Sequence, residues 1–253
     1  MPLIINKLTM KKFSIIIISL ILTSFFAEAQ DWKYASISWV RTTPGEEYNK
    51  ILNDKWAKLA QKRIDDGTIV GWDVWGVGHT TTESKYNVII VTLANEVDSL
   101  WANVGLRKIA PEMTDMDIEI MSQKNYKARK IIYEAVIARK NGYSFVDSLP
   151  QIAVLNYMKV PIGGEAKYEK MENDLNKSPN KNSLKVGWSY SKRLDLLGDN
   201  VYWNYMTADF YKSYKDAMKA RAQTTSWSKE LLQAFKTREL KKSEMVWKMI
   251  SLR

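Results

Sequence analysis

The sequence contains no cysteine, which excludes both a disulfide framework and a lipid anchor attached through a cysteine. A chain without disulfides has to be held together by its hydrophobic core. The chain has 253 residues, and the part after residue 29 is long enough to build such a core. It could do so as one domain or as two domains of about 100 residues each.

Histidine occurs only once, at His79, and this scarcity excludes several kinds of site. A zinc site made of side chains needs several histidine or cysteine ligands. A Ser-His-Asp hydrolase would have to use His79, and the sequence has no G-x-S-x-G motif. We therefore expect no metal site, and we expect His79 to be an exposed residue of the loop "GHTTTE".

Glycine-rich nucleotide-binding loops are also missing. No G-x-x-x-x-G-K loop is present, and "GVGHTT" lacks the third glycine of a dinucleotide fingerprint. Adjacent carboxylates occur at 46–47 and 65–66, at the ends of a predicted helix, where capping and the helix dipole explain them. We therefore expect no cofactor.

Long hydrophobic runs are absent after residue 26, and the single run before it has the form of a signal peptide. Three lysines precede "FSIIIISLILTSFF" (Phe13–Phe26), and the small-residue site "AEA" follows. The run is shorter than the roughly 20 residues of a membrane span. Residues 1–29 are thus predicted to be a signal peptide and the protein to be exported, to the periplasm or beyond. An uncleaved interfacial anchor is the alternative.

Net charge is strongly positive, +10 at pH 7, but the basic residues are scattered. The densest stretch, "ELKKSEMVWK", also contains two glutamates. We therefore expect a solvated basic surface and no specific nucleic-acid partner. Weak attraction to anionic polymers or lipid headgroups is the alternative.

The tripeptide Val-Gly-Trp occurs twice, at 70–72 and 186–188, within a duplicated order of elements. Alternating and helical periodicities predict strand, helix, strand, strand and helix in each copy. In the first copy these are residues 34–41, 43–66, 68–77, 86–94 and 96–104. In the second copy they are residues 151–160, 163–177, 183–193, 201–210 and 211–220.

The predicted organisation is a first unit over 30–110, a connecting region over 111–150 and a second unit over 151–253. The connecting region is expected to be helical in "EMTDMDIEIMSQ". Each unit ends in a similar segment, 127–140 and 236–249, which fits either a helix or a fourth strand; the first composition suits a strand and the second a helix. Arg129 and Arg238 hold equivalent places in these segments, and we expect each to pair with a carboxylate.

This pattern resembles the dimeric α/β-barrel superfamily of ferredoxin-like domains. The resemblance is carried by "PGEEY" and "GGEAKY" at the start of the first helix of each unit and by V-G-W in the following strand. It is strongest to secreted bacterial proteins with two such units in tandem. It implies an α+β fold in which two βαββα units form an intrachain pseudo-dimeric barrel, so that a monomer is expected.

The superfamily includes cofactor-independent monooxygenases, haem-handling enzymes and isomerases, so the fold alone does not give the function. Haem-binding members carry their histidine ligand in the unit that corresponds to the second unit here. That unit has no histidine, and the resemblance therefore does not imply haem.

Candidate site residues are the aromatic and basic residues of the predicted strands. In a barrel they could line an apolar pocket between the two sheets, and plain core packing is the alternative. They are Trp39, Arg41, Trp72 and Trp75 in the first unit, and Tyr157, Lys159, Trp188, Tyr190, Trp203 and Tyr205 in the second.

These residues favour an exported protein that binds a hydrophobic or aromatic small molecule in an aromatic-lined pocket. One alternative is a cofactor-independent enzyme of the monooxygenase or isomerase kind, which would need a roomy cavity with an acid–base group in it. A second alternative is an envelope interaction protein with a filled barrel. The strands supply aromatics without an evident acid–base set, and whether the protein is an enzyme stays open at this point.

Overall fold

The predicted strands are present in the computed structural model, which describes residues 32–43, 46–102, 107, 111–223 and 229–253. The predicted signal peptide over residues 1–29 lies outside the described residues. Within them, eight antiparallel strands form one closed barrel in the order β1-β3-β2-β8-β5-β7-β6-β4.

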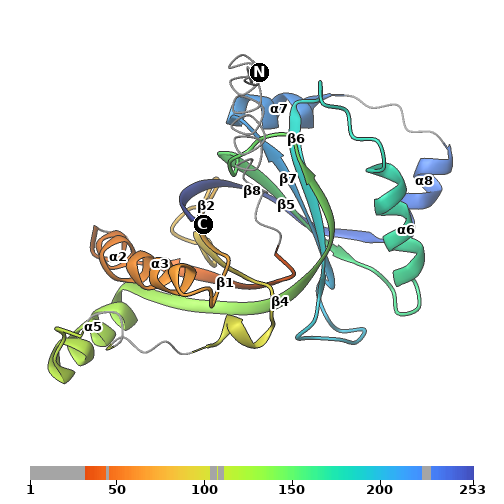
Figure 1. The fold of residues 1–253 in the computed structure, drawn as a ribbon. Coiled ribbons are helices and arrows are strands. Elements are labelled where there is room, and N and C mark those ends of the chain that lie inside the picture. The colour runs from red at the N-terminus through yellow and green to blue at the C-terminus, as the bar shows by residue number, and fades with distance from the viewer. Residues whose placement is uncertain (1–31, 44–45, 103–106, 108–110, 224–228) are drawn as a thin grey trace, which may run out of the picture.

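The two halves of the chain contribute four strands each, in the same order. The first half forms β4-β1-β3-β2 and the second forms β8-β5-β7-β6. Two seams, β2 against β8 and β4 against β6, join the halves and close the barrel. This confirms the predicted α+β fold of two tandem ferredoxin-like units (Figure 1). The strands are β1 (Tyr34–Thr42), β2 (Gly71–Val77), β3 (Val88–Ala94), β4 (Arg129–Ser144), β5 (Ile152–Lys159), β6 (Lys185–Arg193), β7 (Tyr205–Tyr211) and β8 (Glu239–Leu252).

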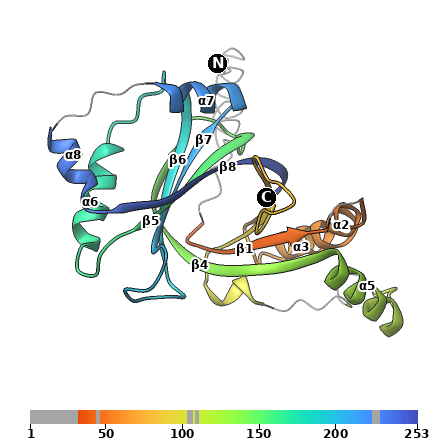
Figure 2. The same ribbon diagram turned by 180° about the vertical axis from the view of Figure 1, so that it is seen from behind.

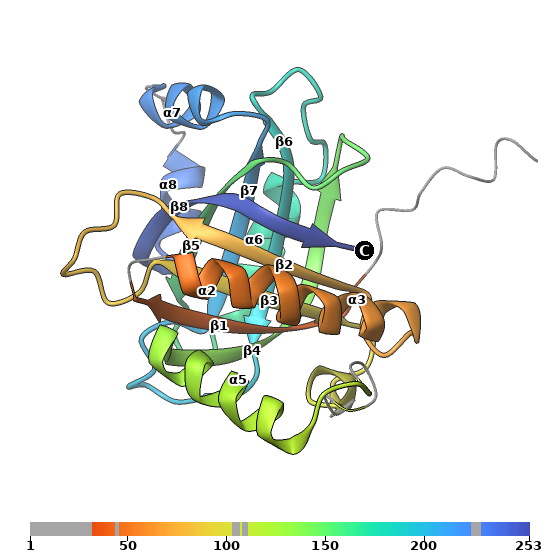
Figure 3. The same cartoon turned by 90° about the vertical axis from the view of Figure 1, so that its left-hand side faces the viewer.

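A long helical segment covers the sheet of the first unit, as its apolar periodicity predicts (Figure 3). It consists of α2 (Glu46–Ile51), a π-helical turn (Leu52–Trp56) and α3 (Ala57–Asp65). It ends where Gly67 takes a left-handed φ of 73°, a conformation that glycine adopts without steric cost. The helix predicted over 96–104 is reduced to a 3₁₀ turn at Asp98–Leu100, and residues 103–104 lie outside the described residues.

The second unit has the equivalent helix α6 (Glu165–Leu175) and, after β7, the helix α7 (Tyr214–Ala222). The side chain of Ser213 caps α7 by accepting a hydrogen bond from the Asp216 amide at 3.1 Å. Figure 2 shows α6 and α8 (Lys229–Phe235) on the outer side of the second sheet.

The connecting region contains the predicted helix, α5 (Asp115–Ala128). Thr114 and Asp117 form a capping box at its start. Both terminal segments then become strands, β4 and β8, so the helical preference of the second segment was wrong. Pairing explains the difference, because β8 bonds to β5 on one side and to β2 on the other, and these ladders override local helix propensity.

Strand alternation divides the apolar side chains into a cluster inside the barrel and clusters beneath the helices. The interior cluster is rich in rings, including Trp39, Trp75, Tyr157 and Trp203. Beneath α2 and α3 the core contains Trp72, and beneath α6 and α7 it divides into two further clusters. The middle of the barrel is thus packed with side chains from both units.

Across the ranges that the structure describes, none of the helices combines the length and the hydropathy needed to cross a bilayer.

Candidate functional site

A buried carboxylate, Glu244 of β8, is the centre of a polar network inside the barrel. The residue is 7% exposed, and three donors surround its carboxylate. The hydroxyl of Tyr157 donates to Oε1 at 2.6 Å, and the hydroxyl of Tyr86 lies 2.8 Å from Oε1 and 3.0 Å from Oε2. These hydrogen bonds hold the carboxylate in one orientation. Each of them also offsets part of the free-energy cost of burying the charge.

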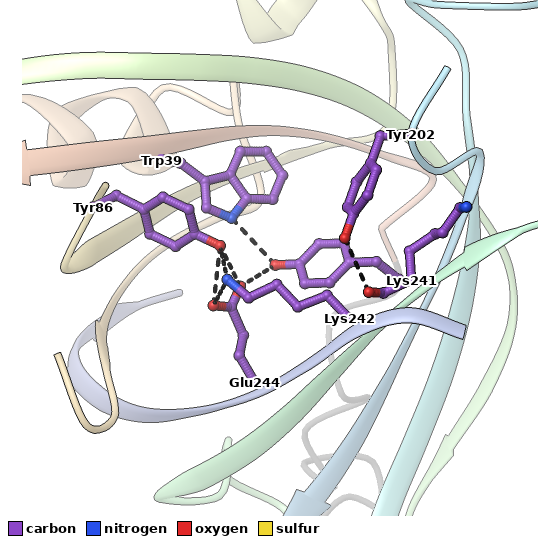
Figure 4. A network of polar contacts seen from close by, with 7 residues as sticks. Trp39, Tyr86, Tyr202, Lys241, Lys242 and Glu244 are labelled. Atoms are coloured by element: carbon purple, nitrogen blue, oxygen red, sulfur yellow. Dashed lines mark hydrogen bonds and ion pairs between the residues drawn. The ribbon is translucent and has the colours of Figure 1, made fainter. Parts of the chain in front are cut away.

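Lys242 supplies the third donor from the same face of β8, two residues before Glu244. Its Nζ lies 2.6 Å from Glu244 Oε2 and 2.5 Å from the Tyr86 hydroxyl oxygen. The ammonium group also lies over the Tyr86 ring, 4.5 Å from its centroid. Figure 4 shows the Lys242 amine directed at Glu244 and Tyr86, whereas the amine of the neighbouring Lys241 points away from them.

The ring cluster behind this network fixes the positions of its hydroxyl groups. Trp39 donates from Nε1 to the Tyr157 hydroxyl at 3.1 Å, so Tyr157 accepts one hydrogen bond and donates another. Trp39 stacks on Tyr133 with 4.2 Å between ring centroids, and Trp203 meets Tyr157 edge to face at 5.4 Å. These contacts link β1, β4 and β5 to the carboxylate on β8.

Burial raises the pKa of all three tyrosine hydroxyls in the network. The negative charge of Glu244 raises the pKa values of Tyr86 and Tyr157 further; at Tyr133 the hydrogen bond with Tyr86 lowers the pKa and the charge of Glu244 raises it. The tyrosines therefore stay protonated over the physiological range and act as hydrogen-bond donors.

A cavity of about 590 Å³ opens onto this network at the end of β2. Tyr86, Lys242 and Glu244 all contribute to its lining. The remaining walls come from the end of β2, the loop that follows it, the adjoining part of β8 and helix α7; they include Val77, His79, Ser84, Lys85, Met218, Arg221 and Met245. The cavity therefore has an acid–base group in walls that contain both apolar and polar side chains.

His79 lies at the rim of this cavity and is exposed, as the sequence predicts. Its Nε2 is 3.1 Å from the Tyr214 hydroxyl, and its backbone has a positive φ of 56°. The ring cluster of Trp39, Tyr157 and Trp203 fills the barrel behind the cavity. These residues do not fit a histidine-ligated haem. In the part of the chain that the structure covers, no group of three His, Cys, Asp or Glu residues could hold a metal ion.

The ten residues predicted as ligand-binding divide into three groups. Trp39, Trp75, Tyr157 and Trp203 lie inside the barrel. Trp72, Trp188, Tyr190 and Tyr205 lie beneath the helices instead, which corrects the expectation that they face the space between the sheets. Arg41 donates to the carbonyl oxygens of Thr82 and Ser84 at 2.6 and 2.5 Å, and Lys159 donates to that of Gly198 at 2.8 Å.

Strand alternation is the reason for the misplaced rings. In each Val-Gly-Trp the tryptophan points to the helix side and the glycine to the other side. A Cβ on Gly71 would lie 2.7 Å from the Arg253 guanidinium, and one on Gly187 would lie 3.4 Å from the Phe210 ring. None of the ten residues lines the cavity itself. Tyr157 reaches the site through its bond to Glu244, and Trp39 reaches it through Tyr157.

Sequence reasoning missed the polar residues of the site: Lys242, Glu244 and Tyr86. The signal for two of them lay in "KKSEM", because residues 242 and 244 share one face only if the segment is a strand. A helical interpretation of this segment separates them.

Comparison with known proteins supports the fold and does not extend to function. No protein-family model matches the chain, and no curated protein sequence matches it. Among solved structures, it is similar to a proposed monooxygenase of Fusobacterium nucleatum, with 9% identity and a TM-score of 0.53 over 87% of this chain and 94% of that one. A dye-decolorizing peroxidase of Bacteroides thetaiotaomicron is 7% identical, with a TM-score of 0.49 over 86% of this chain and 93% of that one. An anthrone oxidase-like protein is 12% identical, with a TM-score of 0.47 over 88% of this chain and 94% of that one. The chain is thus structurally similar to dimeric α/β-barrel proteins.

Proposed function

We propose that the protein binds a small, largely apolar molecule that carries an oxygen acceptor, in the cavity at the end of β2. The observation that carries this proposal is that Tyr86, Lys242 and Glu244 are fixed to one another at a surface of that cavity. A preformed polar group beside apolar walls is the usual arrangement of a small-molecule site.

Lys242 is the group that would contact the ligand oxygen. An ammonium group has three donors, and those directed at Glu244 and the Tyr86 oxygen account for two of them. The Lys242 side chain is 42% exposed, which leaves its third donor accessible from the cavity. A carbonyl, phenol or carboxylate oxygen of the ligand can accept this hydrogen bond.

Apolar side chains would hold the body of the ligand. Val77, Met218 and Met245 line the cavity, and methionine adapts its shape to varied ligands. Lys85 and Arg221 add positive charge to the lining, which favours an electron-rich or acidic ligand. The site differs from the expected ring-lined pocket between the sheets, because the rings pack behind it.

Native mass spectrometry of the protein from its own source tests the proposal, with Lys242→Gln and Lys241→Gln as matched variants. Lys241 is the adjacent residue, and its amine pairs with Glu239 at 2.8 Å outside the cavity. We expect a bound small molecule on the wild type and on Lys241→Gln, and its loss from Lys242→Gln. A ligand-free wild type, or equal loss from both variants, would contradict the proposal and favour the interaction protein with a filled barrel.

A second candidate function is acid–base catalysis without a cofactor, and the position of Glu244 in the cavity lining favours it. Its carboxylate would remove the α proton of a bound β,γ-unsaturated ketone to give a dienolate, and would return that proton at the γ carbon as the C=C bond moves into conjugation. Lys242 would meanwhile stabilise the negative oxygen of the enolate by its charge and hydrogen bond. Such a step is an isomerisation and consumes no co-reactant.

Deuterium exchange separates the enzyme from the binding protein. With 2-indanone as the probe in D₂O, an enzyme would exchange the acidic C–H positions faster than buffer does, and Glu244→Gln would lose the acceleration while still binding the ketone. If the wild type exchanges these positions only at the buffer rate, the enzyme is contradicted and binding without catalysis remains.

We also propose that the protein acts outside the cytoplasm, on the basis of the charged, apolar and small-residue segments of residues 1–29. N-terminal sequencing of the chain from the cell envelope or medium is expected to start near Gln30. A chain that still starts in the first ten residues would contradict this.

A further inference from the structure

The two units contain equivalent buried tyrosines, Tyr48 in α2 and Tyr168 in α6. Both are almost fully buried, at 2% and 0% exposure. Burial raises the pKa of each hydroxyl, and in each unit an arginine at or near the start of the last strand lies close enough to oppose part of the shift. These arginines are Arg129 and Arg238. The internal duplication therefore places a tyrosine and an arginine together twice.

The two copies differ in the charge that accompanies the arginine. In the second unit Glu172, one helical turn after Tyr168, is 4% exposed and has its Oε1 3.8 Å from Arg238 Nε. In the first unit the residue one turn after Tyr48 is Leu52, which is 1% exposed. No carboxylate among the described residues forms an ion pair with Arg129. The expected pairing with a carboxylate is thus confirmed for Arg238 and not found for Arg129.

Arg129 instead faces a second cavity of about 580 Å³, between helix α5 and the end of the π-helical turn. Figure 3 shows α5 beside β4, on the same side of the barrel as α2 and α3. The guanidinium lies over the Trp56 ring, 5.2 Å from its centroid. Trp56 donates from Nε1 to Asn125 Oδ1 at 3.1 Å, which fixes the indole.

The rest of the lining is partly apolar and partly polar, and Ser122 and Lys130 belong to its polar part. Met121 and Ile131 contribute aliphatic surface, and Tyr126 contributes a ring that is 80% exposed. The Asn125 amide turns its oxygen to Trp56, so its NH₂ group offers two further donors. A guanidinium stacked on an indole is held in place, so it loses little freedom when it binds a planar anion.

We propose that this second cavity binds a small organic acid with an apolar or aromatic body. The ligand carboxylate gives Arg129 an anionic partner, as Glu172 does for Arg238, but from the cavity side, and it accepts paired hydrogen bonds from the guanidinium. The apolar body lies against Met121 and Tyr126. This site is separate from the cavity at Glu244 and does not depend on its function.

Isothermal titration calorimetry with phenylacetate tests the proposal, with the neutral phenylacetamide as the matched probe. Wild-type protein is expected to bind the acid at least about tenfold more tightly than the amide, because a charge-assisted bond forms only with the acid. Arg129→Gln is expected to remove this preference. The signal of the Trp56 indole N–H in NMR spectra is expected to shift on titration with the acid.

Leu52→Glu gives an independent test, because it installs in the first unit the carboxylate of the second unit. If the variant folds, its new carboxylate should pair with Arg129 and displace phenylacetate. Lys241→Gln, which lies outside both cavities, should bind the acid as the wild type does. Equal affinities for acid and amide, wild-type binding by Arg129→Gln, or loss of the preference on Lys241→Gln would each overturn the proposal.

Discussion

Arg253 of one unit and Asp73 of the other form a two-pronged ion pair across the seam between β8 and β2. Arg253 Nη1 lies 2.8 Å from Asp73 Oδ1, and Nη2 lies 2.9 Å from Oδ2. The Asp73 side chain is 6% exposed and that of Arg253 is 33% exposed. The pair therefore joins the two halves of the duplication at a partly buried position.

Arg253→Met is expected to destabilise the fold by about 2–4 kcal/mol, because it leaves the buried Asp73 carboxylate without its partner. Urea unfolding followed by circular dichroism measures this change. The double variant Asp73→Leu/Arg253→Met should recover part of the loss, since removing both partners leaves no buried charge.

Lys170→Met is the matched control for this ion pair. Its partner Asp174 lies one turn along α6, and both side chains are more than half exposed. We expect a cost below about 0.5 kcal/mol, as for other exposed helix pairs. Equal costs for Lys170→Met and Arg253→Met would show that the seam pair contributes no more than a surface pair.

Trp188→Ala is expected to cost about 3–5 kcal/mol in unfolding free energy, as aromatic truncations in a core do. The residue is 3% exposed and packs against Tyr190, with ring centroids 5.3 Å apart, beneath α6. Trp247→Ala is the control, because that ring is 43% exposed. A cost below about 1 kcal/mol for Trp188→Ala, together with lost ligand binding, would show that Trp188 contributes to ligand binding and not to the stability of the core.

Alkaline pH is expected to weaken the fold through Tyr86 and Tyr157. Their pKa values are raised in the folded state, by burial and then by the charge of Glu244. The folded state thus holds these protons more tightly than the unfolded chain. Below about pH 10 these tyrosines contribute in full to the free energy of unfolding. Above that pH the tyrosines of the unfolded chain ionise, and the free energy of unfolding falls by about 1.4 kcal/mol per pH unit for each tyrosine.

Urea unfolding at a series of alkaline pH values measures this slope, and tyrosinate absorbance reports ionisation directly. Tyr86→Phe and Tyr157→Phe should each reduce the slope by the contribution of one tyrosine, about 1.4 kcal/mol per pH unit. Tyr126→Phe is the control, because Tyr126 is 80% exposed. Ionisation of Tyr86 and Tyr157 near pH 10 in the folded protein would contradict the assignment.

The fold could be predicted because strand alternation and helical periodicity are local properties that repeat in both units. The repeated Val-Gly-Trp and the matching strand and helix periodicities of the two units predicted the element order. The helical preference of 236–249 failed because β8 is stabilised by pairing with β2 and β5, which are far away in the sequence. A single chain segment carries no signal of such partners.

The site was harder to predict because it depends on which face each residue occupies. Trp72 and Trp188 are tryptophans like those inside the barrel, yet they lie on the opposite face of their strands. Glu244 is chemically important because Tyr86 and Tyr157 come to it from separate strands or loops. That convergence appears only when the barrel closes.

Glu244→Leu is expected to cost about 3 kcal/mol or more, because it leaves the hydroxyls of Tyr86 and Tyr157 and the Lys242 ammonium without their shared acceptor. Glu244→Gln, which keeps one acceptor oxygen, should cost less. Thermal and urea unfolding measure both.

Lys242→Met/Glu244→Leu should recover part of the stability lost in Glu244→Leu, since the unpaired ammonium is removed with the carboxylate. The recovered variant would keep the barrel but lack the polar groups of the cavity, so its ligand binding would show how much of the affinity these groups provide. If Glu244→Leu alone proves neutral, the carboxylate does not organise its donors, and the proposed binding site loses its physical basis.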